Sequence, residues 1–490
     1  MAGEAPAAEA AAREWLTLRG SDPKVVGNVG GVLIDIGQDT GDRGLVEEGI
    51  SLTRQALERV SVTQFKFNLA NGLFGSSPAT PEDAVAVRFD PRVAEGASLY
   101  YEAIDESGDR PEARFNLVSA LAGSGRAIEA LDLARETLSA HPRRGPGWAS
   151  LGDALWSVWA FYGRFPGLLV DASDAYRNAL ELERVDRPFR AHIGECIARI
   201  DGLLAEGAPR THFHRAGAAG EPSRLLIPPA ATWGEGLPAF VCTTDLGLNL
   251  CSGCRAEKSD GYDRFPLEGV LIEPGKGGEA QMKLAEVNLL LQGFMGARAL
   301  LWLSRADDAS QVEITSWPID GLVFSRRTAF LGAAFREAYG VLDRIAALLC
   351  GRFGIESRPA FDKLFFEKHD RKLSFRDSTA WPESVGLRAL VYLSASFETG
   401  NGRFKGLREL RNDLQHSLVL PGRLHADLSR WRTIQVDELE SETVRMLRLI
   451  RAAILYCCEA LRVLEANAAR AAQELGATIR SLDAGKIHRE

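Results

Sequence analysis

The first two hundred residues of the chain consist of short helical segments, at least two of which follow one repeat pattern. Leu117 and Leu151 stand 34 residues apart, and the segments around them show little of the β-branched alternation that marks a strand. A helical unit of this length cannot bury its apolar face alone, so such units stack on one another. This periodicity restricts the fold more than any other feature, because it predicts an extended stack of helices over residues 1–204.

The recurring residues fit the pattern of a tetratricopeptide repeat. If Pro142 ends one unit, Leu117, Gly125 and Ala130 occupy that repeat's Leu, turn Gly and packing Ala positions. The W-x2-L-G residues of the next unit follow one repeat length later, at Trp148, Leu151 and Gly152. Its second helix keeps the A-x3-F-x2-A spacing after an FYGRFPGL insertion, at Ala172, Tyr176 and Ala179. The alternative is a plain helical domain with two accidental matches.

Other segments extend this predicted array in both directions. Residues 22–60 predict a helix pair broken at QDTGDRG, residues 90–105 predict a helix that ends near ESGD, and residues 183–204 predict a closing helix. Stacked helix pairs present a concave surface that binds peptides or proteins and carries no chemistry of its own. We therefore expect a protein or ligand that acts as a trigger to bind the array.

Composition restricts the location and the partners of the chain. Its 490 residues include seven unevenly spaced cysteines and no apolar run near the roughly 18 residues that a membrane span needs. The N-terminal MAGEAPAAEAAAREW has acidic residues where a secretory signal would have basic ones. We expect a cytoplasmic protein with reduced thiols, about two to four domains and no membrane partner. The net charge of −8 argues against a basic nucleic-acid coat but allows a local basic site.

Residues 205–326 are rich in Gly, Pro and Ala, and they predict an irregular connector of short strands and helices. Within them Cys251-Ser-Gly-Cys254 is a C-x2-C pair, with Cys242 nine residues before it. Zinc takes four ligands, and the second paired knuckle of a convincing zinc site is absent. Structural zinc and buried free thiols stay open for these cysteines. We predict no metal and no other cofactor.

Residues 327–490 return to helical periodicity. A long helix is predicted from residue 327, followed by helices over SVGLRALVYLSASFE, RFKGLRELRNDLQHSLVL and a segment that begins at VDELESETV. Pro421 and Gly422 are expected to end the third of these helices. Four long helices joined by loops predict a four-helix bundle, so the whole chain is predicted to be predominantly all-α.

The third helix of this bundle carries the candidate site. At about 100° per residue, its leucines form one stripe that faces the bundle core, and they are Leu407, Leu410, Leu414 and Leu418. Arg408, Asn412 and His416 form a polar row nearly opposite this stripe. Arg411 flanks the leucines, where its long side chain can swing toward the row. The plain interpretation of such a row is a solvated surface.

The types of residue in the row also suit phosphodiester cleavage. An arginine offers a forked donor to phosphate, a histidine exchanges a proton near neutral pH, and an asparagine orients a ribose hydroxyl or an imidazole. The run RNDLQH, from Arg411 through Asn412 to His416, resembles the R-x4-6-H signature of the HEPN superfamily of ribonucleases. One branch of that superfamily has tetratricopeptide repeats before the bundle, in the order found here.

The resemblance implies a metal-independent endoribonuclease that acts as a homodimer, with two motifs facing one cleft. The ribose 2′-OH would attack the adjacent phosphate and give a 2′,3′-cyclic phosphate and a 5′-OH end. In that scheme His416 is the general base or acid, Arg411 neutralises charge on the phosphate, and Asn412 positions His416 or the ribose. Such bacterial architectures commonly serve phage defence or a stress and toxin response.

Basic residues gather around the motif. Residues 403–432 contain seven Lys and Arg against three acids, and Arg403, Lys405 and Arg408 are the candidate RNA-binding residues. A chance run of arginines is the alternative. Asp343, on the first bundle helix, either faces the motif as an orienting acid or forms a surface salt bridge.

Two other functions stay open at the level of sequence. One is a non-catalytic scaffold, in which the repeats bind a protein and the bundle serves for dimerisation. The other is a zinc-containing adaptor whose central region reads a ligand.

Overall fold

Acidic side chains and prolines fix where the first helices of the chain start. The carboxylate of Asp22 accepts a hydrogen bond from a backbone N–H two residues on at 2.9 Å, and Pro23 takes the first helical position, where an N–H is not needed. Asp42 accepts in the same way from Gly44 at 2.8 Å. Between them Gly41 ends the helix at φ 73°, a left-handed conformation that glycine adopts without a Cβ clash.

The computed structural model describes residues 5–75, 87–108, 110–162, 166–182, 187–206, 236–250, 263, 271–272, 277–306, 325–355, 360–369, 372–376, 381–398, 402–416, 419–421, 432–474 and 480–481. This part of the chain is all-α apart from three short two-stranded sheets. None of its helices combines the length and apolar character that crossing a membrane requires.

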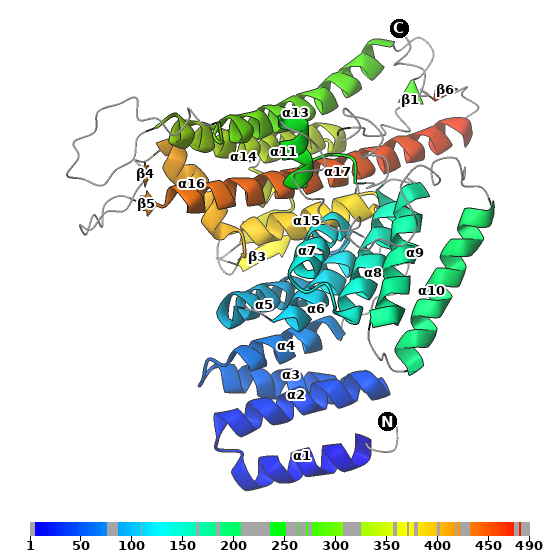
Figure 1. Cartoon of the computed structure of the whole chain (residues 1–490), viewed down its shortest axis with the longest axis vertical. Helices are drawn as coiled ribbons and strands as arrows, with labels where there is room; N and C mark the ends of the chain where they lie inside the picture. Colours follow the sequence, from blue (N-terminus) through cyan, green and yellow to red (C-terminus); the bar gives the residue numbers. More distant parts are fainter. Residues whose placement is uncertain are drawn as a thin grey trace.

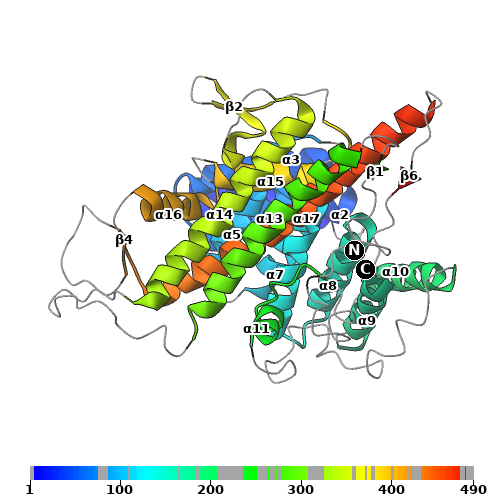
Figure 2. The ribbon, with the colours of Figure 1, turned by 90° about the horizontal axis from the view of Figure 1, so that it is seen from above.

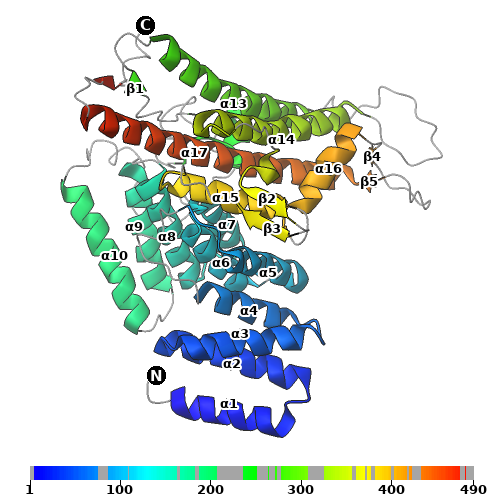
Figure 3. The same cartoon turned by 180° about the vertical axis from the view of Figure 1, so that it is seen from behind.

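The N-terminal helices stack in sequence order, from α1 to α10 (Figures 1 and 3). Their bounds are α1 (Ala5–Arg19), α2 (Pro23–Thr40), α3 (Arg43–Leu57), α4 (Thr63–Gly75), α5 (Pro91–Ser107), α6 (Pro111–Gly123), α7 (Ala127–Ala140), α8 (Gly145–Phe161), α9 (Pro166–Leu182) and α10 (Arg187–Glu206). The helices predicted over residues 22–60, 90–105 and 183–204 are therefore confirmed as helices. We call α1–α10 the array.

The residues that matched the repeat pattern lie where helices pack closely. Trp148 and Leu151 of α8 are buried, and a Cβ on Gly152 would lie 2.7 Å from the ring of Tyr176 on α9. A glycine here lets the two helices approach within contact of that ring. Gly125 forms the turn between α6 and α7 at φ 85°. The assignment of these units to tetratricopeptide repeats stays a prediction.

The C-terminal half of the chain forms a helical bundle above the array. Its helices are α13 (Gly277–Leu303), α14 (Arg326–Phe353), α15 (Val385–Phe397), α16 (Lys405–His416) and α17 (Val436–Glu474). α13, α14 and α17 run side by side as the longest helices, which Figure 2 shows from above. α15 packs on α17, and α16 packs on α14 and α15.

The short elements lie at the edges of this bundle. They are α11 (Leu237–Thr243), the 3-10 turn η6 (Phe361–Lys363), and the strands β1 (Leu271–Ile272), β2 (Phe366–His369), β3 (Lys372–Phe375), β4 (Val419–Pro421), β5 (Arg432–Ile434) and β6 (Arg480–Ser481). β2 and β3 form an antiparallel hairpin, β1 pairs antiparallel with β6, and β4 pairs with β5 in parallel.

Helix α13 corrects the prediction of an irregular connector over residues 205–326. Residues 277–303 form one helix whose buried side chains include Val287, Leu290, Phe294 and Leu301, at helical spacing. This helix packs on α14 and α17 and so adds to the four predicted bundle helices. Helix α13 was not predicted from the sequence because it contains Gly293, and glycine lowers helix propensity. A Cβ on Gly293 would lie 2.9 Å from a methyl group of Val341 on α14, so the glycine allows close packing.

The third predicted bundle helix is also shorter than expected. It was predicted to run through Leu420 and end at Pro421, but α16 ends at His416, and Val419–Pro421 form strand β4 beside β5. The residue before a proline is biased toward extended conformations, and Val419 is β-branched. Both preferences favour the strand.

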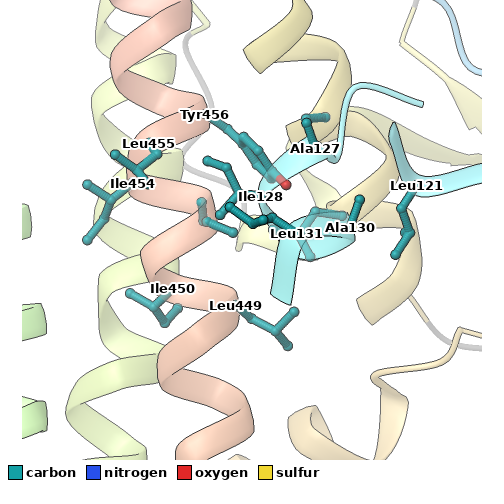
Figure 4. Close-up of a cluster of buried hydrophobic side chains, with 14 of the residues drawn as sticks. Leu121, Ala127, Ile128, Ala130, Leu131, Leu449, Ile450, Ile454, Leu455 and Tyr456 are labelled. Atoms are coloured by element: carbon teal, nitrogen blue, oxygen red, sulfur yellow. The ribbon is translucent and has the colours of Figure 1, made fainter. Parts of the chain in front are cut away.

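The array and the bundle share one hydrophobic core. α7 packs against the middle of α17, and Figure 4 shows Ile128 and Leu131 of α7 beside Leu449 and Tyr456 of α17. All four side chains are buried. Burial of a side chain of this size contributes about 1.5–3 kcal/mol, so the contact holds the two parts of the chain together.

A buried arginine crosses this junction. Arg451 of α17 is fully buried, and its guanidinium donates hydrogen bonds to the carboxylate of Asp132 on α7 and to the carbonyl oxygen of Asp245, which follows α11. Arg135 of α7 contacts the carboxylate of Asp245 from another side, with 3.2 Å between Nη1 and Oδ2. The charges thus connect α7, α17 and the residues after α11.

We expect Arg451→Met to lower the free energy of unfolding by about 3–5 kcal/mol, because Asp132 would keep a buried charge without its partner. Arg54→Met is the matched control, since Arg54 pairs with Glu95 at 2.5 Å while both side chains are more than 40% exposed. That surface pair contributes about 1 kcal/mol or less. Urea titrations of the two variants and of the wild type make the comparison, and equal losses would contradict the expectation.

Candidate functional site

The leucines of α16 dock the helix onto the bundle. Leu407 and Leu410 are buried and Leu414 is half-buried against the same core, as the helical wheel predicted. Leu418 lies outside the described residues. Asn412 is exposed, so the helix presents part of its polar row to solvent.

Three neighbours hold the guanidinium of Arg411. Its Nη2 lies 3.2 Å from Oδ2 of Asp343 on α14, and its Nη1 donates to Oδ1 of Asn412 at 3.0 Å. Its Cζ lies 5.2 Å from the centre of the Tyr339 ring, within the range of a cation–π contact. Of the two alternatives for Asp343, contact with the motif is therefore the one observed.

Burial shapes the electrostatics of this group. Burial raises the pKa of the Asp343 carboxyl, and the charge of Arg411 opposes that rise. Burial also raises the pKa of Tyr339, so its hydroxyl stays neutral at physiological pH. Arg411 therefore has one charged partner and one neutral aromatic partner on α14.

A cavity of about 490 Å³ opens beside Arg411, and we call it the motif cavity. Its walls come from α14, η6, β2 and α16, and from Glu398, which directly follows α15. The polar groups of the lining are Asp343, Asp362, Lys363, Glu398, Arg408, Arg411 and Asn412. Cavities of this size hold small molecules or a single nucleotide.

His416 is the last residue of α16, one helical turn after Asn412. Its side chain lies outside what the structure describes. The backbone alone thus places the histidine of the motif at the end of the helix that presents Arg411.

The three predicted RNA-binding residues lie in three different surroundings. Arg408 lines the motif cavity and pairs with Asp362 at 2.7 Å, where the carboxylate is only 5% exposed. Arg403 pairs instead with Asp105 of the array. Lys405 is exposed and lies 3.6 Å from Glu409. The structure therefore does not bring Arg403 to the motif.

Three of the seven basic residues of this stretch pair with carboxylates from other elements. Arg403, Arg408 and Arg411 pair with acids on α5, η6 and α14, which are remote in the sequence. Arg423, Arg430 and the side chain of Arg432 lie outside the described residues. Sequence reasoning noted Asp343 but missed Asp362, which follows no motif and is recognisable only by its place in η6.

The predicted zinc ligands fall largely outside the description. Cys251 and Cys254 are not among the described residues, and Cys242 is buried in α11. Within the described part of the chain, no three His, Cys, Asp or Glu side chains gather as a metal site would require.

The helical bundle matches a known protein family. A model described as LA2681-like HEPN matches residues 279–463, from the first turn of α13 to near the end of α17. The chain thus contains a HEPN-family domain, and the motif on α16 lies inside it. No curated protein matches the sequence.

We expect Arg408→Ala to lower the free energy of unfolding by about 3 kcal/mol, because it leaves the buried carboxylate of Asp362 without its partner. Lys405→Ala is the control on the same helix, and loss of its exposed pair is expected to cost less than about 0.5 kcal/mol. Thermal and urea unfolding of both variants measure the difference. A harmless Arg408→Ala would mean that Asp362 does not need this arginine in the folded state.

Proposed function

We propose that the HEPN-family domain is a metal-independent endoribonuclease with Arg411 and His416 as its catalytic residues. The observation that carries the proposal is the fixed place of Arg411 at the motif cavity, held by Asp343, Tyr339 and Asn412. A guanidinium held in one position before substrate arrives needs little reorganisation when charge develops on a phosphate.

The proposed reaction is an internal transfer at phosphorus. The ribose 2′-oxygen forms a bond to phosphorus while the bond from phosphorus to the 5′-oxygen breaks. One proton leaves the 2′-OH for a base, and one proton reaches the departing 5′-oxygen from an acid. An imidazole such as that of His416 can serve in either transfer near neutral pH. The products are a 2′,3′-cyclic phosphate and a 5′-OH end.

Arg411 would bind the non-bridging oxygens of this phosphate. A guanidinium has five N–H donors, and the contacts with Asp343 and Asn412 involve only its two terminal nitrogens. The remaining donors suit a charge-assisted contact with phosphate. In this proposal Asp343 is a positioning residue, Asn412 orients the ribose or His416, and the exposed Lys405 attracts RNA.

We further propose that two chains form the working nuclease. The HEPN-family domain has one such motif, and separate histidines for the base and the acid are supplied if two copies of α16 face each other across a cleft. A trigger bound to the array would act through the contact of α7 with α17. A role in phage defence or a stress response belongs to the same proposal.

Incubation of the purified full chain with total RNA in EDTA tests the activity. Wild type is expected to cut RNA and leave cyclic phosphate ends, whereas Arg411→Ala and His416→Ala are expected to lose at least about 100-fold in rate. Arg344→Ala on α14 and His192→Ala on α10 are the matched controls, because both side chains are exposed away from the motif.

Cleavage that survives both motif changes would refute the assigned residues. Absence of cleavage by wild type, together with a stable dimer that retains a protein partner, would favour the non-catalytic scaffold.

The role of Asp343 has a separate test. Asp343→Asn is expected to lower kcat by about 10- to 100-fold with a smaller change in KM, because Arg411 would lose the charge that fixes its position. Asp343→Glu is expected to restore part of the rate. Circular dichroism should show unchanged folding, since Asp343 is one-third exposed. If Asp343→Asn has the same kcat as the wild type, Asp343 has no role in the mechanism.

A further inference from the structure

A second cavity, of about 710 Å³, lies where the array meets the bundle. We call it the junction cavity. α5, α6 and α7 line it from the array, and α14, α17 and the residues just before α16 line it from the bundle. Its volume is within the range of about 300–1,000 Å³ that small-molecule sites occupy.

The lining of the junction cavity is rich in arginine. Its arginines are Arg114, Arg305, Arg327, Arg403, Arg445 and Arg448. Two of its carboxylates are already taken by arginines outside the lining, since Glu129 pairs with Arg126 and Asp132 pairs with Arg451. The carboxylates that remain for the six arginines are Asp105, Glu136, Asp437 and Glu440. The lining itself has six arginines and six carboxylates, so the positive surplus at the cavity comes from Arg126 and Arg451, which occupy two of the carboxylates from outside the lining.

The arginines fall into two groups by the quality of their pairs. Arg305 and Arg327 lie 2.7 Å and 2.6 Å from Glu440, and Arg403 is close to Asp105. The second group has looser contacts. Arg114 and Arg448 share the carboxylate of Glu136 at 3.4 Å and 3.5 Å. Arg448 also donates to the carbonyl oxygen of Thr244, from Nε at 3.4 Å and from Nη2 at 3.3 Å.

Arg445 belongs to this second group. Its nearest carboxylate is Glu442, 3.7 Å away on the same helix and outside the lining. The Cζ atom of Arg445 lies 5.1 Å from the centre of the Phe404 ring, a contact that limits where its guanidinium can move. Arg114, Arg445 and Arg448 are each 24–33% exposed, so solvent reaches them.

We infer that the junction cavity binds a small phosphate-bearing molecule, whose phosphate oxygens contact Arg114, Arg445 and Arg448. Guanidinium groups match phosphate geometry through paired N–H donors, and a phosphate would replace loose contacts of 3.4–3.7 Å with charge-assisted hydrogen bonds. The lining has two aromatic rings: Phe404 is 2% exposed, and Arg403 lies over the ring of Tyr101, with its Cζ 4.9 Å from the ring centre. The phosphate group is therefore the recognised chemistry.

Such a ligand would connect the two parts of the chain. Arg114 lies on α6 of the array, and Arg445 and Arg448 lie on α17 of the bundle. Phe404, which packs against Arg445, directly precedes the first residue of α16, the helix that carries the motif. Control of cleavage from this cavity rests on the proposed function, but binding of the ligand does not.

Titration calorimetry of the full chain in low salt and EDTA tests the binding. Sodium tripolyphosphate and ATP are expected to bind, and adenosine is not. Arg114→Gln and Arg445→Gln are each expected to weaken binding about tenfold or more, the loss of a charge-assisted hydrogen bond. Arg177→Gln on α9 is the matched control, because Arg177 also has loose carboxylate contacts, at 3.3 Å and 3.5 Å, but lies outside the cavity.

Several results would overturn this inference. One is that neither tripolyphosphate nor ATP binds the wild type. Another is that Arg114→Gln and Arg445→Gln bind these ligands as tightly as Arg177→Gln does. Binding of neither small ligand, together with binding of a single-stranded oligonucleotide that Arg114→Gln and Arg445→Gln weaken, would assign the cavity to RNA instead. Thermal unfolding without ligand serves as the folding control, and the two cavity variants should match the wild type there. These experiments measure binding and unfolding, and none of them measures RNA cleavage. Their results therefore remain valid even if the protein does not cut RNA.

Discussion

Burial of the charge on Arg451 is the constraint on which the rest of the structure depends. A guanidinium withdrawn from water is tolerated only if its partners are in place, and they come from α7 and from the residues after α11. The buried charge of α17 therefore has its partners only when the array is packed against this helix. The hydrophobic contacts of Ile128 and Leu131 supply affinity, and the charges fix the alignment. The array and the HEPN-family domain thus fold as partners rather than as separate units on a linker.

The arginines of α16 are likewise paired with carboxylates from other elements. Arg411 is half-buried, and its charge is matched by Asp343, while the neighbouring Arg408 is matched by the more deeply buried Asp362. The two arginines have different tasks, because only Arg411 combines a partly exposed guanidinium with a position next to Asn412. In the proposed mechanism, Arg408 is therefore a structural cation and Arg411 the cation that contacts the substrate.

Sequence reasoning succeeded where the deciding interactions are local. The helix pair within residues 22–60 and the leucine stripe of α16 both depend on neighbours within a few residues. It did not find the partners of Arg403 and Arg408, because those acids are distant in sequence and meet the arginines only after folding. The described arginines of the predicted basic patch are therefore paired with carboxylates. α13 was missed for a related reason, since Gly293 weakens the local helix signal while tertiary packing on α14 stabilises the helix.

The length of α17 has a mechanical consequence. One uninterrupted helix of 39 residues contacts α7 of the array as well as α13, α14 and α15 of the bundle. An α-helix bends only gently, so it transmits displacement along its axis like a stiff rod. A shift of α7 must either carry α17 with it or break the contacts of Arg451 with Asp132. Small movements of the array would then reach the bundle as motion of a single rigid element.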